Sequence, residues 1–249
     1  MAVHANNGAH EVDNVVGCKR LVLVRLADVF VEGREEEVEK VISKILNKPT
    51  KIYGSGRTDA GVHAHGQTFH FDADIKDLGK FKYSLNSLLP DDIFVKNIES
   101  VGITFHARYL VKEKTYIYYI NTGEYNPFER NTVYQLLRPL NIIKMRSVLN
   151  LFKGRHDFRN FTSKTEDENQ FVRTIKEASI KKDGDIVSIT FVGDGFMRYM
   201  VRMIVGSLIE VGLDRLEISK LSEMFLLKER KVVSFKAPSC GLYLKEVLY

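Results

Sequence analysis

Hydrophobic and polar positions follow two periods along the chain from residue 19 onward. Alternating or continuously β-branched and aromatic runs predict strands at 19–26, 50–53, 67–72, 93–98, 114–121, 178–182, 185–191 and 242–248. Apolar residues spaced three or four apart predict helices at 35–46, 81–89, 142–152, 196–212 and 217–226. Strands and helices are interspersed throughout, which predicts an α+β protein with helices covering a sheet.

The order of these elements is similar in the two parts of the chain, and the second part contains a hairpin signal at Asp183-Gly184. We therefore expect two similar α/β halves, with a mixed, mainly antiparallel sheet and a central cleft between them. Residues 1–18 are predicted to be a flexible N-terminal extension. Residues 19–111 and 112–249 are predicted to be an N-terminal and a C-terminal α+β domain.

Composition narrows the functional classes only modestly. An excess of 37 Lys and Arg over 32 Asp and Glu gives a net charge of +5, which permits an anionic partner such as RNA without requiring one. Cys18 and Cys240 offer neither a disulfide framework nor metal-ligand spacing, which favours a reducing, cytoplasmic location. No apolar run reaches the roughly 18–20 residues that span a bilayer, so we expect no membrane segment.

A glycine-rich segment at 54–66, GSGRTDAGVHAHG, is the richest in candidate chemistry. It places Arg57 and Asp59 on a loop between two predicted strands, where glycines allow a close backbone approach to a ligand. If Arg57 lies near Asp59, it should keep that carboxylate ionised, as a nucleophile or base requires. The competing interpretation is a glycine-rich hairpin with solvated polar residues. His63 and His65 lack a third ligand, so we predict no metal site.

Arg202 is the second candidate, because it interrupts a helix that is apolar on almost every side, YMVRMIV. Such a helix is expected to be buried, and a buried guanidinium needs an anion or several acceptors. Asp59 is the best candidate partner. The alternative is that Arg202 extends along its aliphatic stem to the surface.

Tyr116 is the third candidate, on the predicted strand KTYIYYIN. Alternation places Tyr116 and Tyr118 on one face of that strand. Core packing is the usual role of such aromatic residues. The sharper hypothesis is that Tyr116 stacks on a base extruded from RNA.

Several segments together closely resemble the tRNA pseudouridine synthase A family, from residue 19 to the end of the sequence. They are GRTDAGVHA (56–64), NSLLPDDI (86–93), FHAR (105–108), KTYIY (114–118), MVRMIVGSL (200–208) and GLYL (241–244). The resemblance implies that Asp59 is the catalytic aspartate, that Arg57 guides the flipped nucleotide, that Tyr116 stacks on the target base and that Arg202 pairs with the aspartate. It also places Gly56, Thr58, His63, Arg108 and Leu242 in substrate binding.

The activity implied by the resemblance is the isomerisation of uridine to pseudouridine in the tRNA anticodon stem–loop, at tRNA positions 38–40. The family needs no cofactor or metal, works in the cytoplasm and is typically a homodimer. The central cleft would then bind RNA.

One departure from the family pattern leaves a second function open. Family members carry an aromatic-Gly-Trp-Gln segment between the first strand and the first helix, whereas this chain has a short 26–35 connection and no tryptophan. The alternative is a catalytically impaired RNA-binding homologue that lacks the full tRNA-gripping loop. A metal-dependent nuclease would need clustered carboxylates, and the sequence shows no such cluster.

Overall fold

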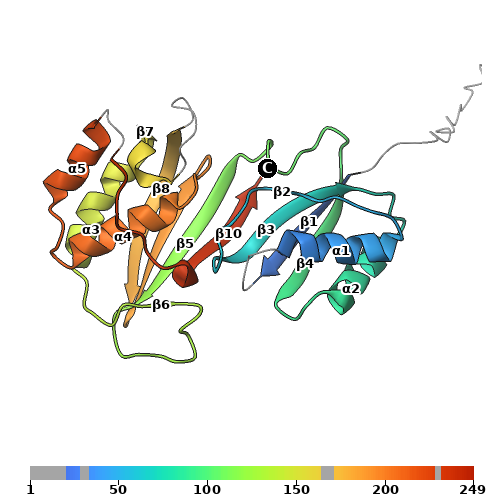
Figure 1. The fold of residues 1–249 in the computed structure, drawn as a ribbon, viewed down its shortest axis with the longest axis horizontal. Coiled ribbons are helices and arrows are strands. Elements are labelled where there is room, and N and C mark those ends of the chain that lie inside the picture. The colour runs from blue at the N-terminus through green and yellow to red at the C-terminus, as the bar shows by residue number, and fades with distance from the viewer. Residues whose placement is uncertain (1–20, 29–33, 164–170, 228–230) are drawn as a thin grey trace, which may run out of the picture.

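The computed structural model describes residues 21–28, 34–163, 171–227 and 231–249. The predicted extension at 1–18 lies outside the described residues, as do residues 29–33 of the short connection. Figure 1 shows the arrangement of the elements, with α1 and α2 at one end of the molecule and α3, α4 and α5 at the other.

The described strands form one mixed sheet in the order β4-β1-β3-β10-β5-β9-β8-β7, with β2 paired to β3 and β6 to β5. Only the β10–β3 and β5–β6 pairs are parallel, so the prediction of a mixed, mainly antiparallel sheet is confirmed. The strands are β1 (Leu21–Asp28), β2 (Tyr53–Gly54), β3 (His63–Asp72), β4 (Ile93–Val101), β5 (Glu113–Asn121), β6 (Tyr134–Gln135), β7 (Gly154–Asp157), β8 (Val172–Asp183), β9 (Ile186–Gly193) and β10 (Leu242–Leu248).

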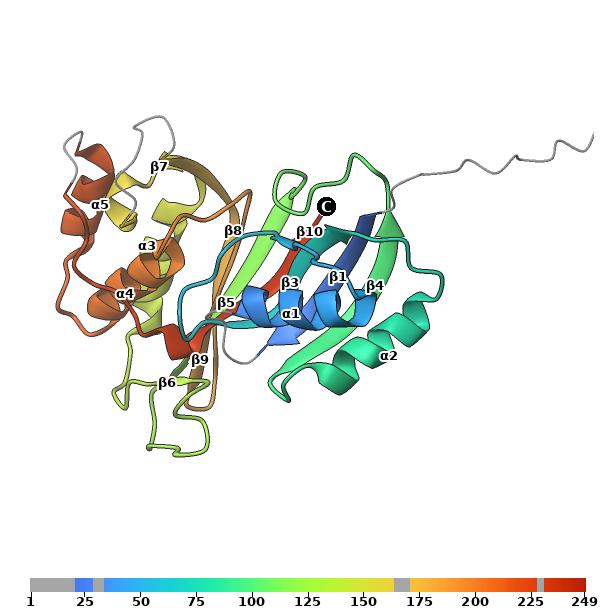
Figure 2. The same cartoon turned by 45° about the vertical axis from the view of Figure 1, so that its right-hand side comes forward.

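Strand β10 joins the two halves of the sheet. It is the last strand in chain order, yet it lies between β3 of the first half and β5 of the second (Figures 1 and 2). Tyr243 on β10 aligns with His63 on β3 and with Ile117 on β5. The two predicted halves therefore share a continuous backbone ladder.

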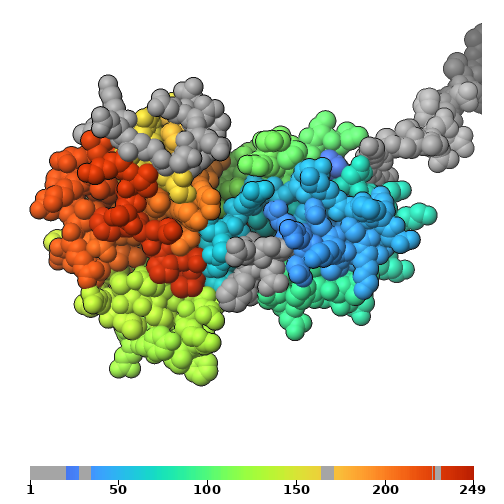
Figure 3. All heavy atoms as spheres, in the orientation of Figure 1, coloured from blue at the N-terminus to red at the C-terminus, as the bar shows by residue number. Residues whose placement is uncertain are grey.

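Two main hydrophobic cores belong to two groups of elements, and these groups lie toward opposite ends of the molecule, as the colours of Figures 1 and 3 show. In the first, α1 (Arg34–Leu46) and α2 (Leu78–Leu88) cover β1, β3 and β4 through Val38, Ile42, Phe81 and Leu85. In the second, α3 (Ile142–Leu149), α4 (Met200–Gly212) and α5 (Ile218–Leu226) pack with β5, β8 and β9. A small third cluster of Ala64, Leu244 and Val247, with Tyr116 packed against it, lies where β3, β10 and β5 meet.

Helix α4 is buried all round, as its sequence predicts. Every residue is buried except Arg202 and Glu210. The predicted start at residue 196 is wrong: the helix begins at Met200 because Tyr199 has left-handed angles, φ 62° and ψ 1°, which interrupt a right-handed helix.

The other differences from the predicted elements concern short strands and the ends of longer elements. The predicted strand at 50–53 is reduced to the two-residue β2, and β3 begins at His63 instead of residue 67. The predicted helix at 142–152 ends at Leu149 and continues as a 3-10 turn. Strands β6 and β7 were not predicted, because two and four residues carry too little periodicity.

Candidate active site

The loop between β2 and β3 carries Asp59 and is fixed at its base by a buried glutamine. Gln67 accepts a hydrogen bond from Ser55 Oγ at 2.8 Å and donates Nε2 to the Gly56 carbonyl at 2.9 Å. At the tip, Gly61 has φ +75°, and a Cβ there would lie 2.7 Å from Ser239 Oγ. Glycine at 61 therefore lets the loop turn and approach the 239–241 turn closely.

Asp59 and Arg202 meet at the junction of the two halves. Arg202 Nη1 lies 3.3 Å from Asp59 Oδ2, and the two side chains are 11% and 18% exposed. Arg202 Nε also donates to the Ala237 carbonyl at 2.8 Å. The guanidinium therefore bridges the loop carboxylate and the 231–238 segment, as the predicted pairing expects, instead of reaching open solvent.

Two opposing effects set the protonation of Asp59. Burial raises the pKa of Asp59 above its ordinary value, while the charges of Arg202, Arg198 and Lys236 lower it and offset part of that rise. The expectation that Arg57 keeps Asp59 ionised is wrong. Arg57 is exposed, and the cations that favour the carboxylate come instead from the second half of the chain.

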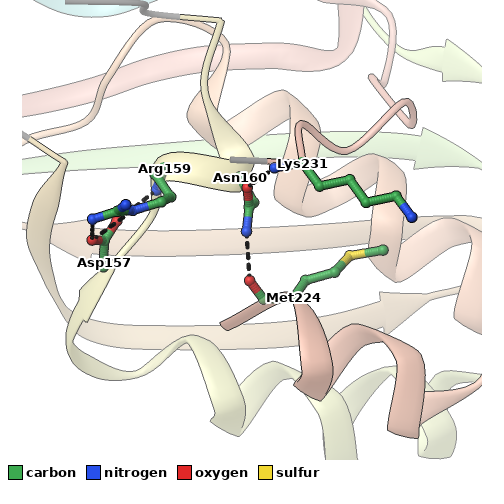
Figure 4. A network of polar contacts seen from close by, with 5 residues as sticks. All are labelled: Asp157, Arg159, Asn160, Met224 and Lys231. Carbon is green, nitrogen blue, oxygen red and sulfur yellow. Dashed lines mark hydrogen bonds and ion pairs between the residues drawn. The ribbon is translucent and has the colours of Figure 1, made fainter. Parts of the chain in front are cut away.

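The segment that receives Arg202 is itself held in place by Asn160. The buried Asn160 amide donates to the Met224 carbonyl at 2.7 Å and accepts from Lys231 N at 2.7 Å (Figure 4). The Asn160 carbonyl also accepts from Val233 N at 2.8 Å. One side chain therefore ties the 3-10 turn at 159–161 to the end of α5 and to the start of the segment that leads to Ala237.

A neighbouring ion pair stiffens the same turn. Arg159 donates Nε and Nη2 to Asp157 Oδ2 at 2.9 and 2.7 Å (Figure 4). Burial alone would raise the pKa of Asp157, but the hydrogen bonds and charge of Arg159 outweigh it and lower that pKa. Phe158 and Phe161 are buried, so the turn also packs into the core of the second half.

Tyr116 faces this site from β5. Its pKa is raised, first by burial and then by the negative charge of Asp59, so the two groups lie within electrostatic reach. Its ring contacts Phe196 edge-on, with centroids 5.1 Å apart. The phenol is therefore neutral at physiological pH, and the ring is fixed from one side.

Arg57 and three of the predicted substrate-binding residues, Gly56, Thr58 and Arg108, lie on the loop or beside it. Thr58 Oγ1 is buried and has no hydrogen-bond partner among the described residues. Arg57 and Arg108 are exposed, and both oppose the effect of burial on the pKa of Glu35, which is raised. Gly56 lies beneath the Lys114 ammonium. The roles of Gly56, Thr58, Arg57 and Arg108 in RNA binding stay predictions.

His63 and Leu242 are placed less favourably for contact with a substrate. The His63 side chain is 1% exposed, lies 2.9 Å from the Asn131 carbonyl through Nε2, and stacks on Tyr243 at 4.7 Å. Burial lowers the pKa of His63. Leu242 is 4% exposed and pairs with Tyr118 across the sheet. Both side chains pack at β10, and neither presents an exposed surface for the predicted substrate contact.

Sequence reasoning missed the cationic cluster around Tyr199. Arg198, Arg202 and Lys236 lie over the Tyr199 ring, with cation-to-centroid distances of 4.9, 5.3 and 4.4 Å. Arg198 precedes Arg202 by four residues, a spacing visible in the sequence. Lys236 comes from a segment without regular structure, so no periodicity points to it.

Among the described residues, no group of three or more His, Cys, Asp or Glu side chains is placed to hold a metal ion. Within the same residues, no helix combines the length and apolarity needed to cross a membrane. An open hollow lined by α1 and residues 47–51 contains none of the predicted site residues.

Comparison with known proteins agrees with these motifs. A family model described as tRNA pseudouridine synthase matches residues 148–249. The chain is 40% identical over 216 residues to a tRNA pseudouridine synthase A from Exiguobacterium sp. (strain ATCC BAA-1283 / AT1b), covering 86% of this chain and 87% of the relative. It is 38% identical over 214 residues to the Mycoplasma genitalium protein of the same name, covering 85% and 87%. The chain belongs to the tRNA pseudouridine synthase A family.

Solved structures give a weaker likeness. The crystal structure of a Cbf5-Nop10-Gar1 complex matches with a TM-score of 0.45 and 14% identity, over 91% of this chain and 48% of the matched chain.

Proposed function

We infer that this protein is a tRNA pseudouridine synthase, an isomerase that converts uridine in tRNA to pseudouridine. The observation that carries this inference is the Asp59–Arg202 pair, with Tyr116 beside it, in a chain about 40% identical to family members over most of its length. The reaction breaks the N1–C1′ bond of uridine, rotates the uracil and joins C5 to C1′. The proton lost from C5 is balanced by one gained at N1, so the conversion needs no oxidant and no added group.

Asp59 starts the reaction, either by attacking C1′ or by removing the C2′ proton. Both routes need the carboxylate, and Arg202, Arg198 and Lys236 favour that form against the effect of burial. Arg202 also fixes one carboxylate oxygen by its contact at 3.3 Å. Preorganised charge of this kind lowers the barrier because no reorientation is needed during the reaction.

Tyr116 acts through its ring. Burial and the nearby Asp59 charge raise the pKa of its hydroxyl, which disfavours the phenolate that a base would require. A neutral aromatic face suits stacking on a base that has left the RNA helix. Phe196 supports the ring from its edge.

The substrate region is the anticodon stem–loop of tRNA. The enzyme works in the cytoplasm as a homodimer. Each chain has an N-terminal domain at 19–111 and a C-terminal domain at 112–249. The two large cores support that division. Tyr125 and Phe128, in the connection between β5 and β6, are 54% and 92% exposed and supply apolar surface for a subunit contact. Light scattering should give twice the chain mass, and a Phe128→Ser variant should lower the dimer's affinity.

The test of the activity is pseudouridine mapping on an unmodified tRNA transcript, with and without the protein. We expect new pseudouridine confined to the anticodon stem–loop, and none with the Asp59→Asn variant. Tight tRNA binding without product, by the unaltered protein, would establish the RNA-binding homologue instead. The intact Asp59–Arg202 contact favours the enzyme.

A further inference from the structure

Lys114 reaches from β5 of the second half onto the catalytic loop of the first. Its Nζ donates a hydrogen bond to the Ser55 carbonyl at 3.0 Å. A Cβ at Gly56 would lie 2.7 Å from the same Nζ, so the ammonium lies directly over the loop backbone, three residues before Asp59. Alternation along β5 places Lys114 on the same face as Tyr116, roughly 7 Å along the strand.

This ammonium lacks an anionic partner in the described part of the protein. The ion pairs there include none to Lys114, whose hydrogen bond to the Ser55 carbonyl uses one of its three protons. Burial, and after it the like charge of Arg108, lower the pKa of Lys114 to about 8. Charges with restricted access to water are usually paired, so the arrangement is unfavourable without an added anion.

We propose that Lys114 binds a phosphate oxygen of the RNA strand beside the target nucleotide, with the Ser55 carbonyl orienting the ammonium for that contact. This proposal rests on the proposed function, since it needs RNA at the catalytic loop. Arg57 and Arg108 flank the same approach, and both act electrostatically on Glu35 at its edge. Glu35, the carboxylate that lies against Gly54, interacts with these two arginines, and a phosphodiester supplies the anion for Lys114.

The contact makes RNA binding depend on protons in a defined direction. A bound phosphate favours charged Lys114, so the pKa of Lys114 rises from about 8 in the free protein, and binding above that pH takes up one proton. Arg108 acts on Lys114 through its like charge, and Glu35, which lies against Gly54, interacts with both Arg57 and Arg108. Tyr249 interacts with Ser55, and burial raises its pKa. The strand neighbours Gly193 and Val247 do not titrate.

The experiment measures binding of a tRNA transcript by fluorescence anisotropy from pH 6.5 to 9.5 at constant ionic strength. It uses the Asp59→Asn protein, which blocks turnover, alone and combined with Lys114→Met or Lys114→Arg. We expect the affinity of the parent to fall above pH 8 by up to tenfold per pH unit. Lys114→Met should bind about tenfold more weakly at pH 7, without that fall, and with a salt dependence about one unit less steep. Lys114→Arg should retain binding and lose the pH dependence.

Lys82→Met is the matched control, because Lys82 also donates to a backbone carbonyl, that of Lys96, but from α2. It should leave the pH dependence unchanged. The proposal would be overturned if Lys114→Met left the affinity, salt slope and pH profile unchanged, yet slowed turnover when made in the protein that retains Asp59. Lys114 would then be only an anchor of the loop. If the protein forms no pseudouridine but its RNA binding shows the expected Lys114-dependent pH profile, the proposed function fails and the phosphate contact stands.

Discussion

Two cations from the second half of the chain meet the catalytic loop, and they are partnered differently. Arg202 contacts the Asp59 carboxylate and the Ala237 carbonyl, whereas the hydrogen bond of Lys114 within the described residues goes to the neutral Ser55 carbonyl. The difference separates two tasks on one loop. A charge already paired within the protein holds a reacting group in place, while a charge without an anion is available for a ligand.

The Asp59→Asn variant removes the carboxylate of the Asp59–Arg202 pair and should have the largest effect. We expect product formation to fall by a factor of roughly 10⁴ or more, as when a reacting group is removed. Burial raises the pKa of Asp59, so ionisation of this carboxyl lowers the stability of the folded protein as pH rises through that pKa. The neutral amide of Asn does not ionise and should add no such desolvation cost. Turnover on a tRNA transcript and thermal unfolding measure the two effects. Substantial turnover by this variant would remove Asp59 from the mechanism.

Removing the cation of the same pair should cost both stability and activity. Arg202→Ala should lower the free energy of unfolding by about 3 kcal/mol, since one partner of a largely buried pair is left alone. Arg202→Lys should recover only part, because an ammonium does not reproduce the forked contact with Asp59 and Ala237. Arg215→Ala is the control, since Arg215 lies 3.8 Å from Glu210 and is 48% exposed. Its cost in urea denaturation should stay below about 1 kcal/mol.

Replacement of Tyr116 should have an effect of intermediate size. Tyr116→Leu should reduce kcat/KM by about 5- to 150-fold, corresponding to the ~1–3 kcal/mol of a stacked base. Tyr116→Phe should retain most activity, because it keeps the ring. Tyr119→Leu, on the opposite face of β5, should leave kcat/KM of the folded protein near that of the parent. Equal activity of the Phe and Leu variants at position 116 would make Tyr116 a packing residue.

The smallest expected effect concerns the cations around the pair. Arg198 lowers the pKa of Asp59 but is exposed, so Arg198→Gln should raise that pKa slightly and move the acidic limb of the rate profile to higher pH. Single-turnover rates between pH 4 and pH 8 measure the shift, which should shrink in high salt. Arg215→Gln should give no shift. An acidic limb that moves to lower pH would contradict the assignment of the limb to Asp59.

The sequence allowed much of this fold to be predicted, because long periodic runs settle their own structure. The helix at α1 and the closing strand β10 lie where their patterns place them. Local pattern does not report the neighbours of a strand, so the insertion of β10 between β3 and β5 was not predicted. The start of α4 was misplaced for a similar reason, since the left-handed Tyr199 lies under Lys236, a cation from a distant part of the chain, as well as under its neighbours Arg198 and Arg202.

The site residues were likewise predictable where the residue types themselves require a partner, and not where the partner depends on the fold. The pairing of Asp59 with Arg202 was predictable because a guanidinium on an all-apolar helix requires an acceptor. The partner of Lys114 is a backbone carbonyl, which leaves no trace in the residue types. His63 was predicted to touch substrate from its place in a motif, yet the alternation of β3 turns its ring against Tyr243. A motif fixes which residues occur together, and the strand register decides which face each one occupies.

The position of β10 has a consequence for the order in which the molecule is assembled during synthesis. The neighbouring strands β3 and β5 are made early, but both pair with residues 242–248. The first half therefore emerges with the β3 edge unpaired at His63 and Ala64, although β2 already pairs with Phe69 and His70, and the cluster of Ala64, Leu244 and Val247 does not yet exist. Contacts between such distant segments form slowly, so Asp59 and Arg202 are brought into register only after nearly the whole chain has been translated. Until then, the open edge of β3 is the surface that a chaperone or a misplaced strand would meet.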